Sequence, residues 1–126
     1  MGIDYGEKRI GIALSDENAS FAFAHNVLEN NKNVIRKIKK ICKENNVRKI
    51  ILGESIDYNG RPNPIMEKIE KFKILLKKET NLPIEYQTEI LTTQEARHFQ
   101  KRSKKIDASA AALILRSFIE KKKMLK

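Results

Sequence analysis

The chain has 126 residues, of which 26 are Lys or Arg and 16 are Asp or Glu, which gives a net charge of +10. This length predicts a single domain over residues 1–126, with one sizeable core. No apolar run approaches the roughly 18 residues that a membrane-spanning helix needs. The acidic start of the chain differs from a secretory signal, so a cytoplasmic location is expected. Cys42 is the single cysteine, which excludes an internal disulfide and a cysteine-based zinc site.

The first part of the chain predicts three short strands. The first begins at Ile3 and ends at Asp4 or Tyr5, the second covers residues 9–15, and the third runs from residue 21 to about residue 28. The connection between the first two suits a hairpin, in which Gly6 permits a positive φ.

The middle of the chain predicts two helices on either side of a buried strand. The first helix starts near Asn33, because apolar residues recur there at helical spacing with lysines between them, and it ends at Asn45. The apolar run 50–53 is typical of a strand that is buried on both faces, and a loop is expected over residues 54–63. Pro64 suits the first position of the second helix.

The last third of the chain predicts a strand over residues 84–87 with its exit at 88–91. A helix start follows at residues 92–95, and a final helix covers residues 107–122. The whole order describes an α/β fold, in which a three-stranded meander precedes strands that alternate with helices.

Three acids fall at the ends of these elements. Asp4 ends the first strand, Glu89 follows the strand over 84–87, and Asp107 opens the final helix. Each also has an ordinary structural explanation: a turn residue, a solvated acid near a capping box, and an acid that the helix dipole favours. The final helix has small residues on the face that Asp107 shares, so this helix can approach a sheet closely.

A convergence of these three acids would require a compensating partner. Two carboxylates about 5 Å apart repel each other by about 3 kcal/mol at an effective dielectric constant near 20. Oxygen ligands of this kind suit Mg²⁺ or Mn²⁺, and two such ions can stabilise the attacking and leaving oxygens of a phosphodiester. The excess of positive charge favours a polyanionic partner such as nucleic acid. The residues alone leave open whether the acids converge.

Four segments resemble the successive motifs of the YqgF/RuvX family of Holliday junction resolvases, which are also described as pre-16S rRNA processing nucleases. These segments are GIDYGEKRIGIALSD, KIILG followed by DYNGRPNP, TEILTTQEA and KKIDASAAALIL. The resemblance implies an RNase H-like fold, with a mixed five-stranded sheet whose strands one to three are antiparallel and whose later strands are parallel, and with helices on both faces.

The resemblance also implies the chemistry. Asp4, Glu89 and Asp107 match the acidic positions of the family, which are expected to bind Mg²⁺ or Mn²⁺ for hydrolysis of nucleic-acid phosphodiesters. The expected partner is nucleic acid, either branched DNA or structured precursor rRNA. A homodimer is a further expectation, because resolvases of four-way junctions usually cut as pairs.

The sequence departs from the family pattern beside two of its motifs. The family's Asp-Glu-Arg-Leu-Ser-Thr is changed here, because Thr88 and Ile90 replace an acid and an arginine. Glu54 stands where the family usually has Gly-Leu-Pro after the fourth strand. Since related resolvases place a catalytic glutamate at the end of that strand, Glu54 is a candidate for an additional metal ligand, and its alternative is a loop acid.

Several basic residues near these motifs are candidate contacts to phosphates, their alternative being an ordinary solvated surface. Arg61 lies in the Asn-Gly-Arg-Pro loop, which is expected beside the site. The other candidates are Lys8, Arg9, Lys101, Arg102, Lys104 and Lys105.

Two other functions compete with a nuclease. The changes at Thr88 and Ile90 favour a catalytically weak RNA- or DNA-binding module that acts in ribosome maturation or transcription. The Asp-x-Gly start followed by Lys-Arg also resembles the phosphate loop of actin-like ATPases and sugar kinases, which share the core fold. A chain of 126 residues lacks the second domain of those enzymes.

Overall fold

The computed structural model of the protein describes residues 1–56, 59–90 and 104–124, and the side chains of 89, 90, 104–107 and 124 lie outside this description. The described part contains five strands and three helices. In chain order they are β1 (Gly2–Tyr5), β2 (Arg9–Ser15), β3 (Ala22–Glu29), α1 (Val34–Glu44), β4 (Ile50–Ile56), α2 (Met66–Thr80), β5 (Ile84–Ile90) and α4 (Lys104–Met124). None of the described helices is long and apolar enough to cross a membrane.

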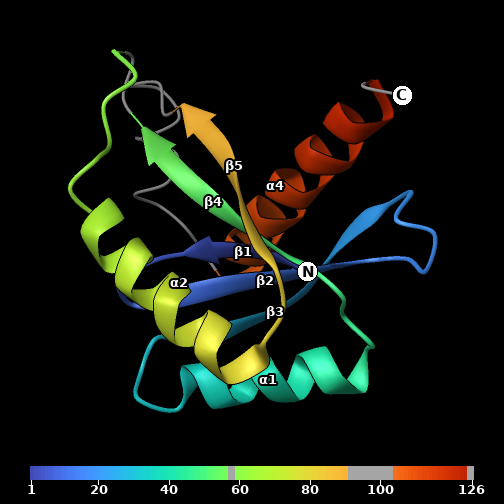
Figure 1. The fold of residues 1–126 in the computed structure, drawn as a ribbon, viewed down its shortest axis with the longest axis horizontal. Coiled ribbons are helices and arrows are strands. Elements are labelled where there is room, and N and C mark those ends of the chain that lie inside the picture. The colour runs from blue at the N-terminus through green and yellow to red at the C-terminus, as the bar shows by residue number, and fades with distance from the viewer. Residues whose placement is uncertain (57–58, 91–103, 125–126) are drawn as a thin grey trace.

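The five strands form one mixed sheet in the order β3-β2-β1-β4-β5 (Figure 1). β1 pairs antiparallel with β2, and β2 pairs antiparallel with β3. β4 lies parallel to β1 on its other side, and β5 lies parallel to β4. The predicted combination of an antiparallel meander with later parallel strands is confirmed, and β1 occupies the centre of the sheet.

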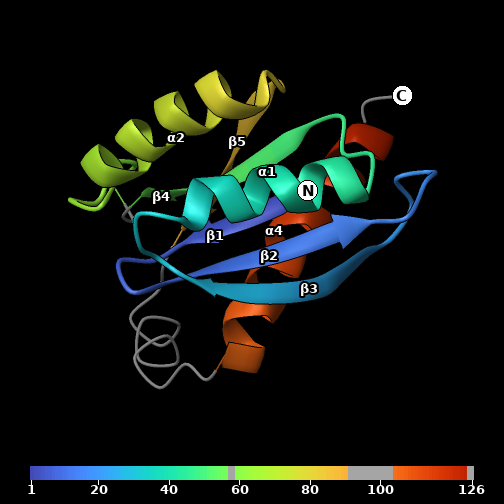
Figure 2. The same cartoon turned by 90° about the horizontal axis from the view of Figure 1, so that it is seen from below.

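Helices cover both faces of this sheet, as predicted. α1 and α2 lie on one face and α4 lies on the other (Figure 2). Successive side chains of β4 point to opposite faces of the sheet and so pack into two different hydrophobic cores. Leu52 packs into the core beneath α1 and α2, whereas Ile51 packs against α4 with Ala111. The side of the sheet toward which a side chain points therefore decides which helices it meets.

Several predicted boundaries are confirmed and others are wrong. β2 and α1 have the predicted extents. β4 and β5 are each three residues longer than predicted, because segment 54–56 pairs with segment 88–90 instead of forming a loop. α2 begins at Met66 rather than Pro64, and α4 begins at Lys104 rather than Asp107. The helix start predicted at 92–95 lies outside the described residues.

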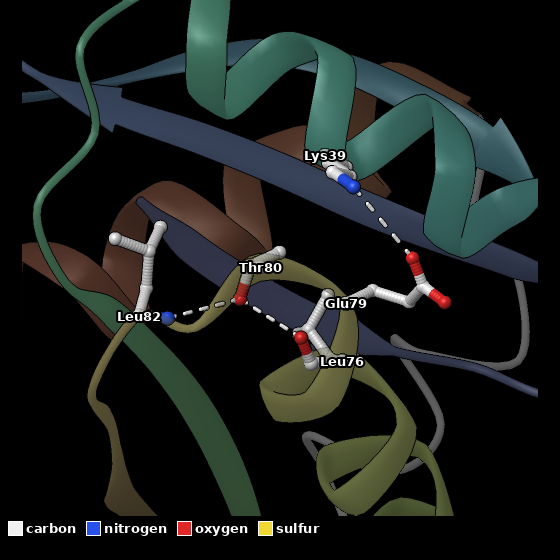
Figure 3. A network of polar contacts seen from close by, with 5 residues as sticks. All are labelled: Lys39, Leu76, Glu79, Thr80 and Leu82. Atoms are coloured by element: carbon white, nitrogen blue, oxygen red, sulfur yellow. Dashed lines mark hydrogen bonds and ion pairs between the residues drawn. The ribbon is translucent and has the colours of Figure 1, made fainter.

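The middle of α1 and the C-terminal end of α2 meet through a small polar network (Figure 3). The ammonium group of Lys39 on α1 lies 3.8 Å from the carboxylate of Glu79 on α2. The Thr80 hydroxyl donates to the carbonyl of Leu76 at 2.8 Å and accepts from the amide of Leu82 at 3.3 Å. The side chain of Thr80 thereby holds the end of α2 and the start of the following connection together.

At two glycine positions, neighbouring atoms leave no room for a Cβ atom. A Cβ on Gly2 would lie 2.8 Å from both the carbonyl oxygen of Ala111 and the Cβ of Leu115, so α4 crosses β1 in direct backbone contact. A Cβ on Gly6 would lie 2.5 Å from the carbonyl oxygen of Arg9. The expectation of a positive φ at Gly6 is wrong, since Gly60 is the glycine with a positive φ in the described part of the chain. The close turn after β1 needs a residue without a Cβ for steric reasons.

The contact between β1 and α4 yields a stability prediction. Gly2→Ala should lower the free energy of unfolding by about 1–3 kcal/mol, because the new methyl group meets backbone atoms that cannot rotate away. Chemical denaturation measures this change. The control is Ala24→Ser, which also adds one heavy atom but does so at an exposed position of β3. A Gly2→Ala protein as stable as the control would contradict the close approach.

Candidate active site

Asp4 is the one charged residue that is buried in the described part of the chain, with 8% of its surface exposed. It lies in β1 opposite Gly11 of β2. Because side chains alternate along a strand, Asp4 points to the same face as Gly2, which is the face that α4 covers. Burial of a carboxylate is unfavourable unless cations or hydrogen-bond donors compensate it. The buried Asp4 therefore identifies this part of the sheet as a candidate functional site.

Glu89 lies near the carboxyl end of β5, where its backbone pairs with Ser55 of β4. The structure corrects the prediction that this residue follows the strand. Ile84 and Tyr86 pack toward the α1 and α2 side, so the two-residue alternation assigns position 89 to the α4 side. An interstrand spacing of about 4.8 Å and a rise of about 3.3 Å per residue put the Cα atoms of Asp4 and Glu89 about 12 Å apart.

Asp107 lies in α4, one helical turn before Ala111 and on the same helix face. Since Ala111 packs directly against Gly2, this face of α4 is the one that meets β1. The backbone thus carries all three predicted acidic positions on the α4 side of the sheet. Of the three, only the side chain of Asp4 is described.

Glu54 lies on the other side of the sheet. It follows Leu52 by two residues in β4, so it points toward the face of α1 and α2. Its Oε1 atom accepts a hydrogen bond of 2.9 Å from the Thr88 hydroxyl. Burial raises the pKa of Tyr86, and the carboxylates of Glu70 and Glu54 raise it further, which agrees with a position of Glu54 on this face. The sheet itself separates Glu54 from the face that carries Asp4.

The loop that contains Arg61 is fixed to the end of β4. Pro62 forms an isolated bridge with Ile56, and the backbone amide of Asn63 donates to the carbonyl of Ser55 at 3.1 Å. The side-chain amide of Asn63 also donates to the Ser55 hydroxyl at 2.6 Å. The exposed Arg61 is therefore presented next to the carboxyl end of β4, where the loop was expected. Sequence reasoning missed the anchoring role of Asn63, whose signal was an amide side chain directly after Arg-Pro.

The remaining basic candidates lie in two other parts of the chain. Lys8 is exposed in the turn between β1 and β2, and Arg9 begins β2. Lys104 and Lys105 belong to the first turn of α4, although they were expected in a loop. The predicted contacts at Lys101 and Arg102 lie outside the described residues.

The donor chemistry at Asp4 fits a divalent cation such as Mg²⁺ or Mn²⁺, because a buried carboxylate offers oxygen ligands and gains from a positive partner. No cluster of three or more His, Cys, Asp or Glu side chains able to hold a metal occurs among the described residues. The side chains of Glu89 and Asp107 lie outside the described part of the chain.

Comparison with protein families gives a match over residues 1–121 to the family described as RuvX, Holliday junction resolvase. A protein of Caldanaerobacter subterraneus subsp. tengcongensis is 32% identical, over 98% of this chain and 96% of its own length. A protein of Clostridioides difficile is 36% identical, over 95% of this chain and 92% of its own length. Both bear the name "Putative pre-16S rRNA nuclease".

Two solved structures share the fold. One is Thermus thermophilus RuvC in complex with a Holliday junction substrate, with a TM-score of 0.59 and 15% identity over 96% of this chain and 93% of that chain. The other is a further Thermus thermophilus RuvC structure, with a TM-score of 0.54 and 13% identity over 95% of this chain and 93% of that chain. The likeness extends over nearly the whole chain and confirms the predicted RNase H-like fold.

The separation of Asp4 and Glu54 by the sheet predicts different effects on metal binding. Asp4→Asn should weaken Mn²⁺ binding about tenfold or more, because it removes a charged ligand from a buried position. Glu54→Gln should leave the Mn²⁺ affinity within about twofold of the original value, since its carboxylate lies on the other face. Calorimetric titration measures both. If Glu54→Gln lost as much Mn²⁺ affinity as Asp4→Asn, Glu54 would be a metal ligand and the assignment to the opposite face would be wrong.

Proposed function

We propose, from the premise that this chain belongs to the RuvX family of Holliday junction resolvases, that it is an endonuclease that hydrolyses nucleic-acid phosphodiesters. The single observation that carries this proposal is the buried carboxylate of Asp4 on the central strand, on the face of the sheet that α4 covers. An acid is costly at such a position, and its cost is recovered in a site that binds cations. The proposed nuclease is one domain over residues 1–126.

The proposed catalytic residues are Asp4, Glu89 and Asp107, which would hold Mg²⁺ or Mn²⁺. Support comes from the backbone positions of these residues on one side of the sheet, as described above. When bound, the cation would supply Lewis-acid stabilisation of the phosphate and a more acidic water. The carboxylates of the protein would set the position and charge of this site, and the close packing of α4 on β1 would hold two of them at a fixed separation.

The proposed substrates are branched DNA or structured precursor rRNA, in the cytoplasm. The names of the relatives support the RNA, and the complex of RuvC with a Holliday junction supports the branched DNA. The net charge of +10 supports either polyanion. Contacts to the phosphates are proposed for Lys8, Arg9, Arg61, Lys101, Arg102, Lys104 and Lys105. For a four-way junction we propose a homodimer, because two symmetric cuts require two sites.

Thr88 supports a second candidate function. This residue replaces an acid of the family motif, and its hydroxyl binds Glu54 on the face of the sheet opposite Asp4. Because Thr88 points away from Asp4, the missing acid would act on the site only through the neighbouring position of Glu89. A site weakened through this neighbour would leave a nucleic-acid-binding module with no turnover. Such a module would bind RNA or DNA with a strong dependence on salt and would act in ribosome maturation or transcription.

Substitution of the acids separates these two functions. Asp4→Asn and Asp107→Asn should each reduce Mn²⁺-dependent cleavage of a four-way DNA junction or precursor rRNA by about 100- to 1000-fold, because each removes several kcal/mol of transition-state stabilisation. Binding of the same substrate should remain within about threefold. Gel-based cleavage assays and fluorescence anisotropy measure the two quantities.

The matched control for these variants is Glu17→Gln, which neutralises an exposed acid in the turn after β2. It should cleave as the unmodified protein does. Full cleavage by Asp4→Asn and Asp107→Asn would refute the assignment of the site. Tight binding by the unmodified protein with no turnover in Mg²⁺ or Mn²⁺ would instead establish the binding module.

A further inference from the structure

The outer surface of α1 carries charge of one sign only over most of its length. Val34, Ile38 and Cys42 of this helix are buried in the core. The fully exposed positions of the helix before Glu44 are all basic, Lys32 precedes the helix, and no acid occurs in the helix until Glu44 at its end. We call this surface the α1 basic face and define it as Lys32, Arg36, Lys37, Lys40 and Lys43.

Few of these cations are neutralised within the protein. Lys39, which lies at the side of α1, pairs with Glu79 of α2 (Figure 3). Lys40 is 3.8 Å from Glu44, and both side chains are largely exposed. Within the part of the chain that the structure describes, the other four members of the α1 basic face form no ion pair. The surface is thus free to attract an external anion.

The arrangement of these cations works against the helix that carries them. Arg36 and Lys40 are four residues apart, and Lys37 and Lys40 are three apart, so like charges face one another along the helix and destabilise it. The first turn contains no acid, and a side-chain hydrogen bond from the N-cap residue Asn33 is absent. Positive side chains near a helix N-terminus are also unfavourable to the helix dipole. A polyanion on this surface would relieve the repulsion.

The lysine-rich composition of the chain does not by itself produce such a surface. α2 has a similar number of lysines on its exposed side, yet Glu67, Glu70 and Glu79 are interspersed among them. Alternating charges of this kind are typical of an ordinary solvated helix. The single sign of charge on α1 is therefore a local property of this helix.

We propose that the α1 basic face binds the phosphate backbone of nucleic acid, at a surface separate from the site around Asp4. The two surfaces lie on opposite faces of the sheet, since α1 covers one face and α4 covers the other (Figure 2). Asp4 points to the face that α4 covers. The inference rests on the proposed function for the identity of the substrate. It adds a second region of contact, remote from the scissile bond.

A membrane surface is a poorer fit to the same charges. A basic amphipathic helix that binds lipid inserts its apolar face among the acyl chains. The apolar face of α1 is already buried, since Val34 is 4% exposed, Ile38 is 0% and Cys42 is 5%. The fully exposed positions of α1 are all charged, and a row of exposed cations is suited to phosphates along a nucleic-acid strand.

The test uses the triple variant Arg36→Gln, Lys37→Gln and Lys40→Gln in the full chain. Its binding to a four-way DNA junction is measured by fluorescence anisotropy in EDTA over a range of salt concentrations. The affinity should fall about tenfold or more at moderate salt, and the slope of log K against log salt should fall by about 2 to 3, because up to three phosphate contacts are lost. Without nucleic acid, the variant should melt at the same temperature or higher, since like charges have been removed.

The matched control is Lys71→Gln, Lys77→Gln and Lys78→Gln on α2, which removes the same charge from the same side of the sheet. It should retain the original affinity within about threefold. An equal loss in both variants would show a general effect of net charge and overturn the proposal, as would no loss in the α1 variant. Tighter binding of the unmodified protein to vesicles containing phosphatidylserine than to the junction would also overturn it.

This outcome is independent of cleavage. If Asp4→Asn abolishes cleavage while the α1 variant binds the junction normally, the proposed nuclease activity is supported and the proposed binding by the α1 basic face is refuted. If the α1 variant loses binding while the unmodified protein shows no turnover, the proposed binding by the α1 basic face is supported and the proposed nuclease activity is refuted.

Discussion

The direct contact between β1 and α4 at Gly2 sets the geometry of the candidate site. Gly2 leaves no space for a Cβ beneath Ala111 and Leu115, so the separation of the strand and the helix is at its lower limit. Asp4 lies two residues after Gly2 on the strand, and Asp107 lies one turn before Ala111 on the helix. The distance between these two acidic positions therefore depends on the absence of a side chain at a third position.

Parts of this fold follow from local patterns and others do not. β2 and α1 could be predicted because alternation and helical spacing of apolar residues are properties of a short segment. The carboxyl ends of β4 and β5 could not, because Glu54 and Thr88 are polar and each becomes part of a strand only by pairing with the other. Such pairing depends on contacts between segments that are distant in the sequence.

The same limit applies to the candidate site. Asp4 could be located from its place at the end of an apolar segment, and its burial agrees with a special role. The face of the sheet toward which Glu54 points could not be predicted while this residue was assigned to a loop. In a strand, by contrast, the two-residue alternation of side chains fixes the face for each position. The association of Asp4 with Glu89 and Asp107 came from family resemblance, because periodicity contains no information about which strand ends are neighbours.

The two faces of the sheet differ in their electrostatic character. On the face of α4, Asp4 is the one buried carboxylate among the described side chains, and the core on this face consists of Ala, Ile and Leu side chains. On the opposite face, the apolar side chains of α1 are internal and its cations are external. The sheet therefore keeps the acid apart from the α1 basic face, and salt should screen the exposed cations of α1 more strongly than the buried acid.

The central position of β1 also orders the assembly of the protein in time. Its pairing with β2 closes through a short turn, whereas its pairing with β4 joins Gly2 to Ile51 across the intervening β2, β3 and α1. Contacts between distant segments carry the larger loop-closure cost and form later. α4 is synthesised after all five strands, so a nascent chain can fold its meander and expose its cations well before Asp4 is covered. The proposed contact of the α1 basic face with nucleic acid would then precede the completion of the candidate site during synthesis.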